Sequence, residues 1–265
     1  MKPKIGVIGG SGFYQLLKNP RFKIIKTPYG KPPEKIAVGF VGKKRVAFLP
    51  RHGNKHQYPP QSVPYKANLW ALKKMGVERI IAVTACGSLQ KEIKRGDFVA
   101  LDQFIDRTRG RGDSYYDGPE TVHVSLANPY CSQLAGIAYQ EGKKQKLRIH
   151  PQGTLVVIEG PRFSTYAESI WFTKMGWDVI NMTGYPETVL ARELELCYSA
   201  IALVTDYDVG VVVKEKIKPV TFKEILDVSK ENNEKAQELV KAIIQEIPEK
   251  RKCDCGQALE FARVN

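Results

Sequence analysis

The chain has 265 residues, of which 43% are hydrophobic, and its formal net charge is +13 at pH 7. This length suits one large α/β domain or two small ones, and the apolar share supports a real core. The longest apolar runs, such as residues 209–213, are far too short to cross a bilayer, and Met1 leads straight into a strand. We therefore expect a cytoplasmic protein rather than a membrane protein or a secreted precursor.

Strand-like and helical patterns alternate along nearly the whole chain. Strands are predicted at residues 4–8, 36–40, 45–49, 79–84, 97–101, 154–159, 179–182 and 198–205. Helices are predicted at residues 65–75, 133–144, 165–175, 186–196 and 221–247, the last opened by a capping box from Thr221 to Glu224. A long polar loop is expected at residues 106–125. No repeat or linker interrupts the pattern, so we predict a single α/β domain over residues 1–265, with a mixed central sheet flanked by helices.

The positive charge raises the question of whether the protein binds nucleic acid. The Lys and Arg residues are scattered along the chain, and no zinc-finger spacing or RNA-binding aromatic motif accompanies them. We interpret the charge as a solvated basic surface that favours anionic substrates. A basic nucleic-acid-binding protein remains the alternative from a different class.

Two turns that follow strands are suited to anions. The glycine-rich run at residues 9–12 can form a nest of backbone amides, to which Ser11 adds a hydroxyl donor. This run lacks the six-residue dinucleotide fingerprint, which argues against an NAD enzyme. After the strand at residues 45–49, Arg51 can clamp a phosphate and His52 adds a second donor. His56 lies four residues further on, but this context does not predict a helix, and we expect no metal there.

Further polar and aromatic side chains follow other strands. Cys86 and Gly87 come after the strand at residues 79–84, where ligands gather in open α/β sheets. No adjacent base activates Cys86, so we interpret it as a thiol that lines a pocket. Phe163 either stacks on a planar ring or is an ordinary core side chain. Asp206 and Asp208 have the i, i+2 spacing that points two side chains to one side of a strand, and form either a solvated turn or a site.

The five cysteines leave several readings open. Cys253 and Cys255 are separated by one residue and lack the second ligand pair of a zinc site. They form either a strained local disulfide or two free thiols. Cytosolic thiols are usually reduced, although intracellular proteins of hyperthermophiles are an exception.

Taken together, these motifs resemble those of the trimeric type of purine nucleoside phosphorylase, especially the members that act on 5′-methylthioadenosine. The matching segments run in order over residues 4–210. They are residues 9–12, 50–53, 84–89, 102–108, 158–164, 178–183, 186–187 and 205–208.

The resemblance implies a role for each matching residue. Phosphate would be bound by Ser11, Arg51, His52, Thr183 and the amide of Ala85. The ribose and its 5′ end would contact Met182, His56 and His123, the last from a neighbouring subunit. The base would lie against Phe163, Cys86 and Gly87 and be read by Asp206 and Asp208, with Thr205 in support.

The reaction implied is attack of phosphate on the anomeric carbon as the purine leaves. An acid at N7 helps the purine leave, and such proton transfers typically contribute about 10²–10⁴-fold. Asp206 is the candidate for this acid, with a pKa raised by burial and by Asp208. Phosphate is a co-substrate, and neither a metal nor an organic cofactor is expected.

Substrate choice follows from the same two acids. Asp208 can accept a hydrogen bond from a 6-amino group, whereas related enzymes that prefer 6-oxopurines tend to carry Asn at the position of Asp206. We therefore predict adenine as the base. The alternative is a phosphorylase for 6-oxopurine nucleosides or methylthioinosine, because Gly184 and Tyr185 before Pro186 resemble relatives that act on methylthioinosine.

The resemblance also implies an assembly and two cross-links. The active unit would be a homotrimer or a dimer of trimers, because His123 reaches a neighbour's site. Similarity to thermophilic archaeal members implies disulfides between Cys131 and Cys197 and, within the tail at residues 253–265, between Cys253 and Cys255.

Overall fold

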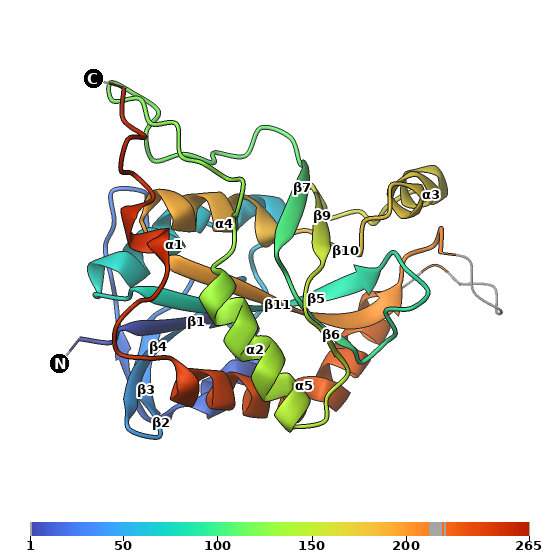
Figure 1. Cartoon of the computed structure of the whole chain (residues 1–265), viewed down its shortest axis with the longest axis horizontal. Helices are drawn as coiled ribbons and strands as arrows, with labels where there is room; N and C mark the ends of the chain where they lie inside the picture. Colours follow the sequence, from blue (N-terminus) through green and yellow to red (C-terminus); the bar gives the residue numbers. More distant parts are fainter. Residues whose placement is uncertain (1, 212–218, 220, 265) are drawn as a thin grey trace.

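The computed structural model describes residues 2–211, 219 and 221–264, and its centre is an 11-stranded mixed sheet (Figure 1). The strands are β1 (Ile5–Gly9), β2 (Lys18–Lys23), β3 (Ile36–Val41), β4 (Lys44–Pro50), β5 (Arg79–Ser88), β6 (Phe98–Ala100), β7 (Gln103–Arg107), β8 (Ile149–His150), β9 (Thr154–Ile158), β10 (Val179–Asn181) and β11 (Cys197–Tyr207). The helices are α1 (Tyr65–Lys74), α2 (Ser132–Lys144), α3 (Tyr166–Lys174), α4 (Gly184–Glu193) and α5 (Phe222–Glu246), and short 3-10 turns are η1 (Ser11–Leu16), η2 (Pro60–Ser62) and η3 (Asp254–Gln257).

Strand β5 is the hub of the sheet. It pairs in parallel with β1 through Ala82 on one side and with β11 along its whole length on the other. Near its end it also pairs with β10, which runs antiparallel to it at Gly87 and Ser88. Its first six residues are buried, as expected for a parallel strand covered on both faces. Both halves of the sheet therefore meet along β5.

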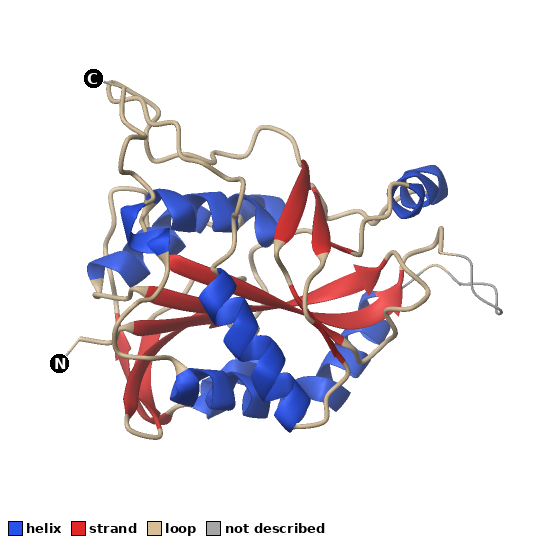
Figure 2. Ribbon diagram, viewed as in Figure 1, coloured by secondary structure: helices blue, strands red, loops and turns tan. Residues whose placement is uncertain are grey.

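Helices cover the two faces of the sheet (Figure 2). On one face α1 packs with α4, and Leu69, Leu72 and Leu190 belong to one buried cluster. On the other face α2 packs with α5, and Leu134 and Leu239 belong to a second cluster. Helix α3 projects beyond these layers at the far end of the sheet (Figure 1). None of the helices in the described ranges is long and apolar enough to cross a membrane.

The predicted fold class is confirmed, and most predicted elements appear within a few residues of their expected bounds. β5 extends to Ser88 rather than stopping at Thr84, because its end pairs with β10 and β11. Helix α4 starts at Gly184 rather than Pro186, with Tyr185 in a non-helical conformation. The exposed edge strand β2 was not predicted, because its sequence has no apolar face for a pattern to reveal. The capping box at Thr221 is confirmed, with Glu224 as its partner.

The state of the cysteines differs from the two predicted disulfides. All five are free thiols in the structure. Cys86 lies in β5, whereas the other four lie together in one cluster rather than in two bonded pairs.

Candidate functional site

The predicted site residues gather around the carboxyl-terminal half of β5. The pairing of β5 with β1 ends at Ala82, and the pairing with β10 starts at Gly87 on the same stretch of the sheet. Between these two ladders the structure describes no strand beside β5 apart from β11. The gap leaves Ala85 exposed although the residues on either side of it are buried. Parallel sheets collect ligands at such breaks in strand order.

Asp206 lies over this gap because β11 bulges next to it. The β5–β11 register shifts between Val204 and Asp206, so that Asp206 pairs with Gly87. A Cβ atom at Gly87 would lie 3.1 Å from the Asp206 Oδ2 atom, so only a glycine leaves the carboxyl group its full room. The hydroxyl of Thr205, the bulged residue, donates to Asp206 Oδ1 at 2.6 Å. Oδ2 is therefore the carboxyl oxygen left for a ligand.

Asp208 follows the end of β11 and is more deeply buried than Asp206. The hydroxyl of Ser164 lies 2.8 Å from its Oδ2 and 3.1 Å from its Oδ1. Ser164 comes from the loop after β9, so the loop and the strand end are held together. Phe163, the preceding residue, is 40% exposed. This exposure contradicts the reading of Phe163 as an ordinary core side chain and leaves its ring available to a planar ligand.

Burial raises the pKa of the two carboxyl groups and of the thiol at this edge. It raises the pKa of Asp206, and the neighbouring Asp208 raises it further, while the bond from Thr205 lowers it. Burial also raises the pKa of Asp208, against hydrogen bonds from Ser169 and Ser164 that lower it. The pKa of the Cys86 thiol is raised by burial and then by Asp206. A protonated, buried Cys86 fits a thiol that lines the site and does not act as a nucleophile.

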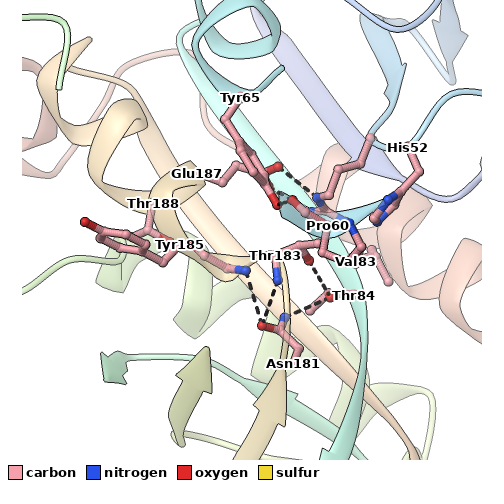
Figure 3. Close-up of polar contacts among 12 residues, drawn as sticks. His52, Pro60, Tyr65, Val83, Thr84, Asn181, Thr183, Tyr185, Glu187 and Thr188 are labelled. Carbon is pink, nitrogen blue, oxygen red and sulfur yellow. Dashed lines mark hydrogen bonds and ion pairs between the residues drawn. The ribbon is translucent and has the colours of Figure 1, made fainter. Parts of the chain in front are cut away.

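A second set of polar groups lies at the start of α4 (Figure 3). The Asn181 side chain donates to the Thr84 hydroxyl at 3.0 Å and accepts from the amides of Thr183 and Gly184, each at 3.2 Å. The Thr84 and Thr183 hydroxyls lie 3.5 Å apart. Thr183 is the N-cap residue of α4, yet its side chain makes no capping bond. The uncommitted hydroxyl of Thr183 and the positive dipole end of the helix favour an anion at this point.

Arg51 is buried beside this helix start, but its guanidinium nitrogens already have hydrogen-bond partners within the protein. Its Nε and one terminal nitrogen donate to the two carboxylate oxygens of Glu187, both at 2.8 Å, and the other terminal nitrogen donates to the Val83 carbonyl at 3.1 Å. The Tyr198 hydroxyl donates to Glu187 as well, at 2.6 Å. Arg51 is thus a fixed positive charge whose bidentate partner is Glu187 rather than a free clamp, and this differs from the role that the sequence suggested.

His52 and His56 lie together with stacked rings, whose centroids are 4.2 Å apart. His52 Nδ1 is 2.8 Å from the Tyr58 carbonyl, so Nδ1 carries the proton that is donated to this carbonyl. Burial, and then Arg51 and His56, lower the pKa of His52 to about 4, although its bond to Tyr58 opposes them. The rings are stacked and do not converge on one point. Phe222, at the start of α5, packs against His56 with a centroid distance of 5.6 Å.

Met182 is fixed by a residue of the long loop. A Cβ atom at Gly160 would lie 2.6 Å from the Met182 sulfur, so the thioether packs directly on the Gly160 backbone. Arg111 donates to the carbonyls of Met182 at 3.0 Å and Glu159 at 2.6 Å, and its Nε lies 3.2 Å from the Glu159 carboxylate. Arg111 therefore ties the loop to the ends of β9 and β10.

Gly184 and Tyr185 have mainly structural contacts. A Cβ atom at Gly184 would lie 2.4 Å from a methyl carbon of Leu155, so α4 can approach β9 only with glycine there. The Tyr185 hydroxyl donates to Asp113, and its ring packs near Phe104. Figure 3 shows the Tyr185 ring pointing away from His52 and Thr183. Through its bond to Asp113, Tyr185 anchors the long loop to the start of α4.

Of the expected residues whose side chains the structure describes, His123 is not joined to this site within the chain. His123 is exposed, and its amide donates to the Ala262 carbonyl at 2.8 Å, which places it beside the C-terminal segment. The side chain of Ser11 lies outside the described part of the structure. The other expected residues lie on β5 and β11 or on the segments that follow β4, β9, β10 and β11.

Reasoning from the sequence missed several residues that hold the site. Glu187 could have been found by asking which carboxylate would neutralise a buried Arg51, because a buried charge requires a partner. Arg111 and Asn181 carry no comparable signal, since their partners are mostly backbone groups. Among the described residues, the cluster able to hold a metal ion is the group of four cysteines, which is not part of this site.

The chain is similar to known enzymes over nearly its whole length. Residues 4–245 match the phosphorylase superfamily. An S-methyl-5′-thioadenosine phosphorylase of Thermofilum pendens is 48% identical, with 99% of both chains covered. The enzyme of the same name from Pyrococcus horikoshii is 50% identical, with 97% of this chain and 98% of the relative covered.

Solved structures extend the likeness. Methylthioadenosine phosphorylase from Schistosoma mansoni in complex with adenine has a TM-score of 0.90 at 36% identity, covering 97% of this chain and 96% of the other. A mutant of that enzyme in complex with methylthioadenosine has a TM-score of 0.89 over the same shares of both chains. The chain belongs to the phosphorylase superfamily.

Proposed function

We propose that this protein catalyses phosphorolysis of 5′-methylthioadenosine to adenine and 5-methylthioribose 1-phosphate. The observation that carries the proposal is the carboxyl group of Asp206, held over Gly87 at the open edge of β5 with Oδ1 bonded to Thr205. The relatives that share about half of the sequence bear the name of this activity.

The two acids divide the recognition of the purine. Ser164 donates to both oxygens of Asp208, and this favours the ionised form, which can accept from a 6-amino group. Asp206 is bonded to the hydroxyl of Thr205, while burial and the like charge of Asp208 favour its proton. With Oδ1 taken, the proton on Oδ2 is donated to N7 as the glycosidic bond breaks. Phe163 stacks on the base.

Phosphate occupies the region between β5 and the start of α4. Thr183 supplies a hydroxyl donor at the start of α4, Ala85 contributes its amide, and Arg51 contributes a positive charge fixed by Glu187. His52 and Ser11 complete the set. Phosphate then lies beside the anomeric carbon and stabilises the positive charge that develops there. The reaction as proposed uses no metal and no organic cofactor.

The sugar lies between Met182 and the stacked histidines. Met182 supports the ribose, and His56 lies near its 5′ end, where Phe222 provides an apolar ring for a methylthio group. The protein functions as a homotrimer or a dimer of trimers, in which the exposed His123 reaches a neighbour's site. Because Tyr185 points away from His52 (Figure 3), it gives no support to the alternative substrate methylthioinosine.

Incubation with methylthioadenosine, with and without phosphate, tests the proposal. We expect adenine to be released only when phosphate is present, and hypoxanthine to be released from inosine much more slowly. Faster release of hypoxanthine would favour the 6-oxopurine alternative. Release of adenine without phosphate would contradict phosphorolysis.

A further inference from the structure

The turn that leads from β10 into α4 has an irregular backbone. Thr183 has φ −134° and ψ −9°, and Tyr185 has φ −115° and ψ 138°, so neither residue has helical dihedral angles. In a regular helix the Met182 carbonyl would accept from the amide four residues later, but that residue is Pro186, which has no N–H. The turn therefore needs a donor from elsewhere in the chain to satisfy this carbonyl.

Arg111, from the long loop, supplies the missing donors. Its Nη1 atom donates to the Met182 carbonyl at 3.0 Å and to the Tyr185 carbonyl at 2.6 Å. Its Nη2 atom donates to the Glu159 carbonyl at 2.6 Å, and its Nε atom lies 3.2 Å from the Glu159 carboxylate. A guanidinium group presents five N–H donors in one rigid plane, so a single side chain can hold these three carbonyls in fixed relative positions.

These bonds flank Thr183 along the chain. Arg111 holds the carbonyls of Met182 and Tyr185, which come before and after Thr183. The Asn181 side chain holds the amides of Thr183 itself and of the next residue, Gly184 (Figure 3). The backbone from which the Thr183 hydroxyl projects is thus held through its carbonyls by one side chain and through its amides by another.

Arg111 is itself held firmly in place. Its side chain is only 4% exposed, and Glu159 provides the partner that a buried cation requires. Further along the same loop, the Ser114 hydroxyl and the Tyr115 amide donate to Glu193 in the last turn of α4, both at 2.7 Å. The loop is therefore fixed at the end of α4 as well as at its start, independently of the bonds that Arg111 makes to the turn.

We propose that Arg111 is a positioning residue for the anion site, which orients the Thr183 hydroxyl toward phosphate by holding the carbonyls on either side of it. This inference rests on the proposed function, in which Thr183 binds phosphate. Arg111 acts through the backbone rather than by contact with the anion, because each of its three nitrogens already donates to a protein oxygen. The long loop is then part of the machinery that binds phosphate.

Sulfate binding to the whole protein, measured by calorimetry, tests this role without turnover. Arg111→Ala should weaken sulfate binding by at least about tenfold, since a displacement of about 1 Å in a positioned group can cost about a hundredfold. Adenine, whose expected partners lie on β11 and at residues 163–164, should lose far less affinity. Added guanidinium chloride, below unfolding concentrations, should restore part of the sulfate affinity relative to sodium chloride at the same ionic strength.

The matched control is Arg109→Ala in the same loop. The Arg109 side chain is exposed, and its amide, which donates to the Glu159 carboxylate at 2.9 Å, is kept by alanine. This variant should bind sulfate as the wild type does. A tenfold loss in Arg109→Ala as well would show that any change in the loop weakens the site, and would contradict a specific role for Arg111.

A second variant keeps the test decisive if Arg111→Ala does not fold. Arg111→Lys retains the charge but lacks the planar fork, so it should also bind sulfate more weakly than the wild type. Wild-type sulfate affinity in either folded variant would overturn the positioning role, and so would equal losses for sulfate and adenine, which a merely structural role would produce. A wild type that binds sulfate but releases no adenine from methylthioadenosine would contradict the proposed function and leave the sulfate comparison valid.

Discussion

At the residue scale, Asp206 and Asp208 differ in how many of their carboxylate oxygens accept a hydrogen bond. Asp206 accepts from Thr205 through one oxygen only, whereas Ser164 lies within bonding distance of both oxygens of Asp208. Desolvation raises the pKa of both groups, and the hydrogen bonds to Asp208 oppose that rise and favour its ionised form. In the proposed mechanism, this difference favours Asp206 as the acid and Asp208 as the acceptor.

The substitution Asp206→Asn should separate base recognition from folding. We expect kcat/KM for methylthioadenosine to fall by roughly 10²–10⁴-fold, because an amide cannot give up a proton to N7. The loss with inosine should be far smaller. Steady-state assays with both nucleosides give the comparison, and Asp227→Asn, an exposed acid on α5, is the control. Equal losses with both nucleosides would show that Asp206 does not set base preference.

His52 should make anion binding depend on pH. Its pKa of about 4 leaves it neutral near neutral pH, with its Nδ1 proton held by the Tyr58 carbonyl. An anion beside Nε2 raises the pKa of His52, so His52 takes up a proton when the anion binds. Anion binding therefore weakens as the pH rises. Sulfate is a suitable probe, because it does not itself titrate in this range. Calorimetry in buffers of different ionisation enthalpy should show proton uptake in the wild type and none in His52→Gln, and equal uptake in both would exclude His52 as the proton acceptor.

At the element scale, the strand ends could be predicted and their exact contacts could not. Residues such as Arg51 and Cys86 follow apolar runs, so a strand–helix pattern is enough to place them at one edge of a sheet. The bulge at Thr205 depends on the pairing of β11 with β5, which no local pattern encodes. The partner of Arg51 is likewise 136 residues away along the chain. Long-range pairing therefore sets what the local pattern leaves open.

Gly87 provides a test of how β5 and β11 build the site together. In Gly87→Ala the new methyl group would lie 3.1 Å from Asp206 Oδ2 and 3.2 Å from a methyl carbon of Ile180. We expect kcat/KM for methylthioadenosine to fall by roughly tenfold or more, because the carboxyl group is displaced from the base. The affinity for sulfate, the probe of the proposed phosphate site, should change little, because Thr183 and Arg51 of that site are not neighbours of Gly87.

The matched control for this change is Gly136→Ala on α2. A Cβ atom at Gly136 meets nothing within 4 Å, and alanine in a helix is favoured over glycine by about 0.5–1 kcal/mol. The control should therefore raise thermal stability slightly and leave activity as it is. If Gly87→Ala also left activity unchanged, the close approach of Asp206 to β5 would have no part in catalysis.

At the scale of the whole molecule, the chain holds His123 apart from the groups it is expected to assist. The loop that carries it runs beside the C-terminal segment (Figure 1), through a bridge between Val122 and Arg263. His123 is exposed there. If a neighbouring subunit supplies this side chain, each complete site combines Asp206 of one chain with His123 of another.

Mixing two defective variants tests this shared site. We expect Asp206→Asn and His123→Ala each to lose at least about tenfold in kcat/KM for methylthioadenosine. In trimers reassembled at random from equal amounts of the two, about a quarter of the sites would combine an intact Asp206 with an intact His123. The mixture should therefore recover about a quarter of wild-type activity. The control mixes Asp206→Asn with a chain that carries both substitutions, Asp206→Asn and His123→Ala. This mixture should not recover activity, because no site then has an intact Asp206. Failure of the first mixture to recover, after subunit exchange has been verified by mass spectrometry, would place His123 outside the neighbour's site.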